Sequence, residues 1–168
     1  SANKKKSQKR TKGGSYINEE EKRIILEILD DLKSTGELKG LDIGIITGYS
    51  GQKELLRKSI KATGLDKIAS KIDINTLDAF QGRENDIIIY STVRTRDSIG
   101  FQKEKERVNV AFSRAKKLLI VCGDKNFFYN FDDQDNKFVE IIDYISEEEE
   151  CEIILLKYSQ DRVLSALV

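Results

Sequence analysis

The polar segment at residues 76–86 contains the residue types that a nucleotide site requires. It reads Thr-Leu-Asp-Ala-Phe-Gln-Gly-Arg-Glu-Asn-Asp and leads into an apolar run. Gly82 would let a ligand approach the backbone, Arg83 supplies a guanidinium fork for an anion, and Glu84 can accept hydrogen bonds from ribose hydroxyls. Taken alone, the segment is equally well explained as a polar cap on a sheet.

Two arginines seven residues apart form a second candidate. Arg107 and Arg114 lie in a predicted helix at residues 105–116, where positions seven apart differ by about 20° around the helix axis. Both guanidiniums would then point along one edge of the helix, which suits nucleotide phosphates. The alternative is a pair of surface arginines with carboxylate partners such as Glu104 or Glu106.

A strand that ends in a glycine-flanked turn is the third candidate. Residues 45–52 read Ile-Ile-Thr-Gly-Tyr-Ser-Gly-Gln, and they open a helix whose first N–H groups favour anions. Tyr49 stands where its ring could stack on a base. The alternative is a connecting turn in which Tyr49 covers the core.

Composition excludes several other kinds of site. The 168 residues contain no His, so there is no Ser-His-Asp triad and no His-containing zinc or iron site. Cys122 and Cys151 cannot form a structural zinc site, and we expect reduced thiols of an intracellular protein. No G-x-x-x-x-G-K-[ST] sequence occurs, so this chain has no P-loop. Asp124 is therefore interpreted as a cap residue rather than a magnesium ligand, and no metal site is expected.

The elements that must position these candidates alternate between helix and strand. We predict helices at 18–36, 52–61, 105–116 and 136–145, and strands at 43–47, 72–76, 86–92, 118–122 and 152–156. Asn18 and Glu21 form a capping box at the first helix. The alternation indicates an α/β fold of three layers with a mostly parallel central sheet and ligands outside the carboxyl ends of its strands. Because residues 77–85 are too few for an ordinary crossover, the strands on either side form a hairpin or a crossover compressed to a single helical turn, and their buried character favours the crossover.

Charge is balanced overall, with 29 basic and 29 acidic residues, but it is unevenly distributed. Residues 3–14 carry a net charge of +6, which suits either phosphate contact or a solvated linker, and residues 132–152 carry −9. The absence of Met indicates a piece of a longer protein, with residues 1–14 as a tag remnant and linker and 15–168 as one domain. No apolar run approaches the ~20 residues that span a bilayer, so we expect a cytoplasmic protein without membrane contact.

Together and in this order, these segments resemble the second RecA-like domain of superfamily 1 helicases. The most similar branch is the 5′→3′ branch that contains the RNA-surveillance and replication helicases. Residues 15–21 are similar to its S-Y-x-N-x-x-E segment, 43–52 to its motif IV, 74–91 to its motif V and 107–124 to its motif VI. The resemblance covers about residues 15–124, and Gly48 replaces the usual Pro before the tyrosine.

The resemblance implies an ATP site, with Mg²⁺, in a cleft between two RecA-like domains. The N-terminal domain, outside this chain, would supply the P-loop and the acids that bind Mg²⁺. Arg114 would act as an arginine finger, supported by Arg107. The other nucleotide-binding residues would be Tyr49, Gln52, Gly82, Arg83 and Glu84, and those at single-stranded DNA or RNA would be Thr47, Thr76, Asp78 and Arg94.

Two functions remain open on these grounds. The first is the C-terminal motor domain of an ATP-dependent DNA or RNA helicase or translocase, monomeric and inactive by itself. The alternative is a stand-alone nucleic-acid-binding or regulatory module that keeps the fold without catalysis. An independent nucleotide hydrolase is disfavoured because the chain has neither a P-loop nor a His.

Overall fold

The computed structural model describes residues 8–36, 38–69, 71–80, 82–103, 105–131, 136–147, 151–155 and 163–167. The strands are β1 (Gln8–Arg10), β2 (Tyr16–Asn18), β3 (Asp42–Thr47), β4 (Lys71–Thr76), β5 (Asn85–Ser91), β6 (Ala115–Gly123), β7 (Cys151–Leu155) and β8 (Val163–Leu167). The α-helices are α1 (Glu19–Thr35), α2 (Ser50–Ala62), α3 (Lys105–Phe112), α4 (Lys125–Tyr129) and α5 (Lys137–Glu147). Three 3₁₀ helices join them: η1 (Leu65–Lys67), η2 (Asp78–Phe80) and η3 (Gly100–Lys103).

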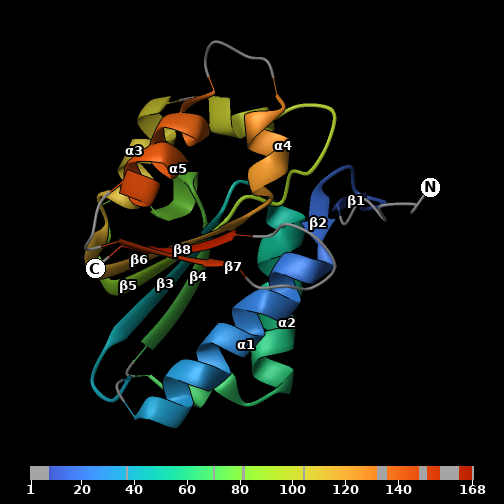
Figure 1. The fold of residues 1–168 in the computed structure, drawn as a ribbon. Coiled ribbons are helices and arrows are strands. Elements are labelled where there is room, and N and C mark those ends of the chain that lie inside the picture. The colour runs from blue at the N-terminus through green and yellow to red at the C-terminus, as the bar shows by residue number, and fades with distance from the viewer. Residues whose placement is uncertain are drawn as a thin grey trace.

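The central sheet lies between two layers of helices. Its strand order is β4-β3-β5-β6-β8-β7, in which the first four strands are parallel and β8 is antiparallel to both β6 and β7. Helices α1 and α2 cover one face, and α3, α4 and α5 cover the other (Figure 1). The predicted three-layer α/β fold with a mostly parallel sheet is confirmed.

Alternate residues of the central strands supply two apolar layers. In β5, Ile87 and Ile89 pack with the buried residues of α1 and α2, while Ile88 and Tyr90 pack on the opposite face. Phe128 of α4 stacks there on a phenylalanine of α5, with 4.3 Å between ring centroids. Because both faces are covered, the strand is apolar throughout instead of alternating with polar residues.

The crossover between β4 and β5 is as short as the sequence predicts. Both strands pair in parallel with β3, on its two sides, so residues 77–84 cross over β3 through η2. Gly44 of β3 makes room, because a Cβ there would lie 2.6 Å from Phe80 Cζ and 2.7 Å from Ile88 Cδ1. The Phe80 ring therefore packs directly against the backbone of the sheet.

The helix predicted at residues 105–116 is shorter in the structure. Helix α3 ends at Phe112, and β6 begins at Ala115. The Arg114 N–H donates to the Ala111 carbonyl at 3.3 Å, which tightens the last turn, and the Arg114 carbonyl accepts from Asn85 N–H at 3.1 Å. Pairing with β5 therefore ends the helix. The predicted alignment of Arg107 with Arg114 on one helix is wrong.

The N-terminal arm is not a solvated linker where the structure describes it. Gln8–Arg10 form β1, which pairs with β2, and residues 1–7 lie outside the described part of the chain. The Gln8 side chain is buried, and its Oε1 accepts from the N–H groups of Thr95 and Arg96 at 2.8 and 3.2 Å. The arm is thereby fixed to the segment that follows β5.

Three smaller predictions concern termini and cysteines. Asp124 caps α4 by accepting from Phe127 N–H at 3.1 Å, as predicted. Cys122 is a free, buried thiol whose pKa burial raises, and the side chain of Cys151 lies outside the described residues. The acidic run at 147–150, which the sequence predicts to be a solvated turn, lies outside the described residues except for Glu147, the last residue of α5. Among the described helices, none combines the length and the apolar character that crossing a bilayer needs.

Candidate nucleotide edge and its surroundings

Glu84 and Arg114 lie next to one another at the amino edge of the sheet, where β5 and β6 begin. The hydrogen bond from Asn85 N–H to the Arg114 carbonyl, at 3.1 Å, makes their backbones neighbours. The Glu84 side chain is 54% exposed and Arg114 is half-buried. The two residues therefore share one edge of the sheet, and it is the amino edge rather than the carboxyl edge at which the sequence predicts ligands.

The Arg114 guanidinium is held by a carbonyl oxygen rather than by a carboxylate. Its Nε donates to Val110 O at 3.3 Å, which fixes the side chain at the end of α3. Within the described ranges no carboxylate forms an ion pair with it, whereas Arg107 pairs with Asp78. An arginine held in this way keeps its full charge for an incoming anion.

Gly82 and Arg83 belong to the crossover rather than to this edge. Gly82 is exposed, and nothing lies near the position of a Cβ. Glycine is nevertheless favoured there, because the φ of +77° is strained for other residues. Arg83 forms an ion pair with Asp73 of β4. Because β3 and β5 separate β4 from β6, this pair directs Arg83 away from Arg114. Gln81, between the crossover turn and Gly82, lies outside the described residues.

A β-bulge at the start of β6 brings two lysines to the same edge. Asn85 pairs with Ala115 and Ile87 with Leu118, so Lys116 and Lys117 together oppose Asp86. Lys116 Nζ lies 3.9 Å from Glu84 Oε2, and Lys117 Nζ lies 3.2 Å from Asp86 Oδ1. Neither lysine was a predicted site residue, because their position depends on the pairing of β6 with β5.

Asp86 has a structural role at this edge. Its carboxylate accepts from Asp42 N–H at 3.0 Å, and this bond, together with Lys117, lowers the pKa of Asp86 below its ordinary value. The carboxylate thus ties β5 to the first residue of β3.

Tyr49 lies at the opposite edge, so its predicted contact with the same nucleotide is wrong. Thr47 pairs with Ser91 at the carboxyl ends of β3 and β5, whereas Glu84 precedes the first residue of β5. A strand of seven residues separates the two edges by about 20 Å. Tyr49 is 4% exposed, and its ring meets the Tyr16 ring edge-on at 5.6 Å. The alternative interpretation, a tyrosine that covers the core, is correct.

Gln52 is also a buried structural residue rather than a nucleotide contact. Its Oε1 accepts from Asn18 N–H at 2.8 Å, and its Nε2 donates to Asn18 O at 3.2 Å and to Ser91 Oγ at 3.1 Å. The side chain therefore fastens β2 to the end of β5. Because Gln52 is fully buried, its side chain cannot contact a nucleotide in this structure.

Glu21 is the centre of a buried polar cluster at the carboxyl end of β5. Its carboxylate accepts from Ser91 Oγ at 2.6 Å, from Thr92 Oγ1 at 3.1 Å and from Val93 N–H at 2.9 Å. Burial dominates these hydrogen bonds and raises the pKa of Glu21 to about 7. The capping box is therefore half correct, because Asn18 caps α1 while Glu21 turns to β5.

Thr47 and Arg94 do not reach the surface, so their predicted contact with nucleic acid is wrong in this structure. Thr47 is buried, and its Oγ1 accepts from Tyr49 N–H at 3.4 Å. Arg94 is 3% exposed; its guanidinium lies 4.1 Å from the centroid of the Tyr16 ring, and its Nη2 donates to the Arg96 carbonyl at 3.1 Å. Both residues stabilise the carboxyl edge from inside.

Thr76 and Asp78 lie at the surface of the carboxyl edge. Thr76 is half-buried at the end of β4, and the Asp78 side chain is 67% exposed in the turn that follows. Asp78 Oδ1 lies 3.1 Å from Arg107 Nη2, so this ion pair connects the crossover turn to α3. Arg107 therefore points to the crossover, and not along the edge that Arg114 occupies.

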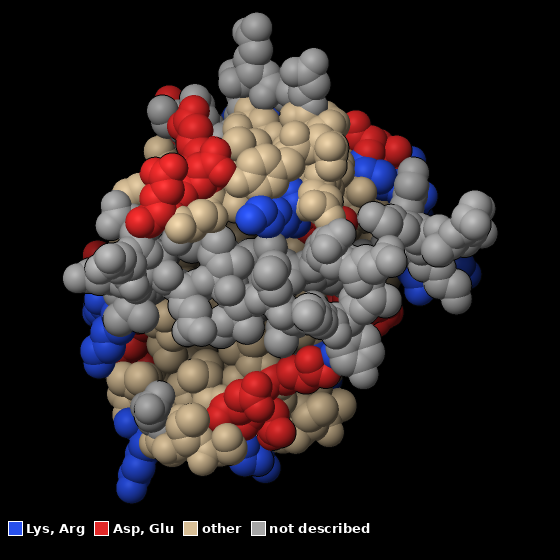
Figure 2. Space-filling model, viewed as in Figure 1, with Lys and Arg blue, Asp and Glu red and all other residues tan. Residues whose placement is uncertain are grey.

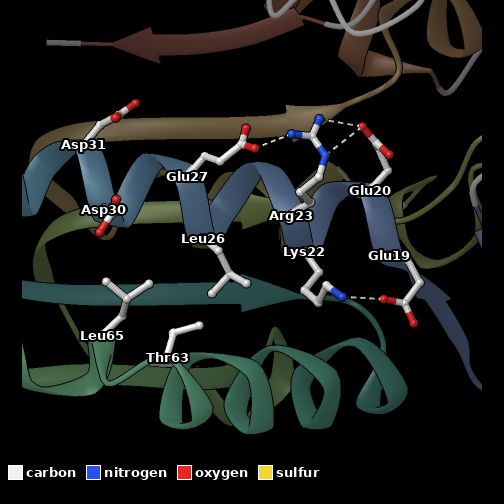
Figure 3. Close-up of a pocket in the computed structure, with 10 residues that line it drawn as sticks. All are labelled: Glu19, Glu20, Lys22, Arg23, Leu26, Glu27, Asp30, Asp31, Thr63 and Leu65. Carbon is white, nitrogen blue, oxygen red and sulfur yellow. Dashed lines mark hydrogen bonds and ion pairs between the residues drawn. The ribbon is translucent and has the colours of Figure 1, made fainter.

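A surface hollow of about 860 Å³ lies elsewhere, along α1 (Figure 3). Most of its charged lining is acidic: Glu19, Glu20, Glu27, Asp30 and Asp31, beside Lys22 and Arg23. The two basic residues already form ion pairs along the helix with Glu19, Glu20 and Glu27. Figure 2 shows acidic side chains gathered over α1 and over α5 on this face. A triphosphate would be repelled there, so the hollow is no alternative nucleotide site.

Comparison with known proteins decides the family. Residues 1–126 match the family described as "AAA domain", which is most of the 168 residues. The chain belongs to this AAA domain family. The match includes β1 and the predicted linker, and it ends just beyond β6.

The relatives of this AAA domain include helicases from archaea and eukaryotes. It is 38% identical over 136 residues to an uncharacterized ATP-dependent helicase of Methanocaldococcus jannaschii, covering 81% of this chain and 18% of that protein. It is 38% identical over 117 residues to DNA polymerase alpha-associated DNA helicase A of Saccharomyces cerevisiae, covering 66% and 16%. A homolog of regulator of nonsense transcripts 1 in Drosophila melanogaster is 40% identical over 116 residues, covering 67% and 10%. The predicted kinship with the RNA-surveillance and replication helicases is confirmed.

This chain spans less than a fifth of the length of these three relatives. Among solved structures, an N-methyltransferase of Haemonchus contortus matches with a TM-score of 0.50 at 11% identity, covering 88% of this chain and 37% of that chain. At that identity the likeness shows the doubly wound α/β fold alone.

Proposed function

We propose that this AAA domain is the C-terminal motor domain of an ATP-dependent helicase or translocase that acts on single-stranded DNA or RNA. An N-terminal RecA-like domain outside this chain completes the ATP site and holds the P-loop and Mg²⁺. Within the described residues no three His, Cys, Asp or Glu side chains gather as metal ligands. One observation carries the proposal: Glu84 lies beside Arg114 at the amino edge, and the Arg114 guanidinium donates to the Val110 carbonyl rather than to a carboxylate.

Arg114 acts as the arginine finger in this proposal. Negative charge spreads over the γ-phosphate oxygens as the terminal bond of ATP breaks, and a guanidinium at those oxygens stabilises that state. The bond from Nε to Val110 O sets the direction of the side chain before ATP arrives. Such a residue contributes about 10³–10⁵ to turnover in related phosphoryl-transfer enzymes.

In this proposal Glu84 contacts the ribose of ATP at the amino edge, and single-stranded nucleic acid binds at the carboxyl edge. The exposed carboxylate of Glu84 accepts hydrogen bonds from ribose hydroxyls. Thr76 and Asp78 face single-stranded nucleic acid at the carboxyl edge. Helix α3, about 12 Å long, runs between the two regions: Arg107 pairs with Asp78, and Arg114 lies two residues beyond the end of the helix. Closure of the two domains around ATP and reopening after hydrolysis would move this unit along the strand.

Substitution of Arg114 in the full-length protein tests the proposal. Arg114→Ala should lower ATP turnover by about 10³-fold or more and change the affinity for single-stranded nucleic acid by less than about threefold, because a finger acts in the transition state. Arg114→Lys should keep only a little more ATP turnover than Arg114→Ala, since an ammonium group lacks the planar fork of a guanidinium. Arg23→Ala, at a partly buried, ion-paired arginine of α1, should leave ATP turnover unchanged.

An equal loss of turnover and of nucleic-acid affinity in Arg114→Ala would mean that the arginine is structural. Unchanged turnover in Arg114→Ala would favour the alternative function, a binding or regulatory module without catalysis.

A further inference from the structure

The amino edge holds an arrangement that the proposed roles of Glu84 and Arg114 do not explain. Their backbones are neighbours, and a carboxylate beside a guanidinium ordinarily forms an ion pair. In the structure Glu84 turns instead to Lys116, and Arg114 keeps its carbonyl partner. A second cation therefore competes with Arg114 for this carboxylate.

The β-bulge supplies that group. In a regular strand Lys116 and Lys117 would point to opposite faces of the sheet. The bulge sets both lysines opposite Asp86; both are exposed, and each approaches a different carboxylate. Lys117 takes Asp86, which already accepts from Asp42 N–H, and Lys116 takes Glu84.

We propose that Lys116 is a positioning residue that holds the Glu84 carboxylate apart from Arg114, so that the arginine stays unneutralised for ATP. This inference rests on the proposed function. Without Lys116, Glu84 pairs with Arg114, and ATP must break that pair before the guanidinium can meet a phosphate. The Lys116–Glu84 pair is weak, at 3.9 Å between two side chains that are more than half exposed, so its loss affects the site far more than the fold.

A double-mutant cycle in the full-length protein tests this role, with ATP turnover as the readout. Lys116→Ala should lower kcat/KM for ATP by about two- to fivefold, the effect expected of an exposed ion pair. Lys116→Arg should restore it. In a Glu84→Gln background, Lys116→Ala should have no further effect, because no carboxylate remains to trap Arg114.

Lys117→Ala is the matched control, since Lys117 occupies the same bulge and pairs with Asp86. It should leave kcat/KM within experimental error of the wild type. Equal losses in Lys116→Ala and Lys117→Ala would overturn the proposal, as would an undiminished effect of Lys116→Ala in the Glu84→Gln background. If Arg114→Ala abolishes turnover while Lys116→Ala changes nothing, this inference fails and the proposed function stands. If Arg114→Ala leaves turnover unchanged, the proposed function itself fails.

Discussion

At the residue scale, Glu21 shows how burial and hydrogen bonding oppose each other at one carboxylate. Ser91, Thr92 and Val93 donate to it, which favours the charged form, yet loss of water favours the neutral form more strongly. The nearby charge of Asp124 acts in the same direction as burial. The carboxylate also stabilises a strained backbone. Val93 has a φ of +68°, and its N–H donates to Glu21 in that conformation.

This balance predicts a pH-dependent stability. The folded protein releases the Glu21 proton at a pKa of about 7, whereas the unfolded chain releases it near 4.5. The folded state therefore binds more protons between these values, and the free energy of unfolding falls as the pH rises from about 4.5 to about 7 and levels off above it, by about 3 kcal/mol in all and about 2 kcal/mol above pH 5.5. Because the chain contains no His, few other groups titrate in this range.

Urea unfolding at a series of pH values from 5.5 to 8.5 measures the effect. Glu21→Gln removes the titration and should give a nearly flat profile, with the variant becoming the more stable protein at the alkaline end. Parallel profiles for wild type and variant would show that Glu21 ionises without cost to the fold.

At the element scale, apolar runs predicted the strands because both faces of the sheet are covered. The end of α3 could not be predicted from local pattern, since it depends on the hydrogen bond from Asn85 N–H to Arg114 O, 29 residues apart in the sequence. The same limit applies to Gln52 and Arg94. Their residue types suggest ligand contact, but the partners that bury them, Asn18 and Tyr16, come from another part of the chain.

The crossover predicts a large effect from one small side chain. Gly44→Ala should destabilise the fold by about 1–3 kcal/mol, because its Cβ would meet Phe80 Cζ at 2.6 Å and Ile88 Cδ1 at 2.7 Å. Chemical denaturation measures the change. Gly13→Ala is the control: the nearest atom to its Cβ would be Thr11 Oγ1 at 4.0 Å. A neutral Gly44→Ala would mean that Phe80 does not pack on β3 as described.

At the scale of the whole molecule, the sheet separates two surfaces that sequence motifs alone did not distinguish. Glu84 and Arg114 were linked in the sequence only through the family resemblance; the structure makes them neighbours because β5 and β6 begin side by side as parallel strands. The opposite position of Tyr49 did not follow from the motifs, because a motif shows the order of residues and not the edge at which they emerge. In the proposed function, Glu84 and Arg114 at the amino edge bind ATP, and Thr76 and Asp78 at the carboxyl edge bind single-stranded nucleic acid.

The central claim is that this AAA domain contributes half of an ATP site. It is tested most directly by steady-state ATP turnover of the 168-residue chain alone, compared with the full-length protein at saturating single-stranded nucleic acid. Circular dichroism of the chain verifies that it is folded. We expect turnover by the full-length protein and none above background by the folded chain, because the P-loop lies outside it. Turnover by the chain alone at the rate of the full-length protein would contradict the account.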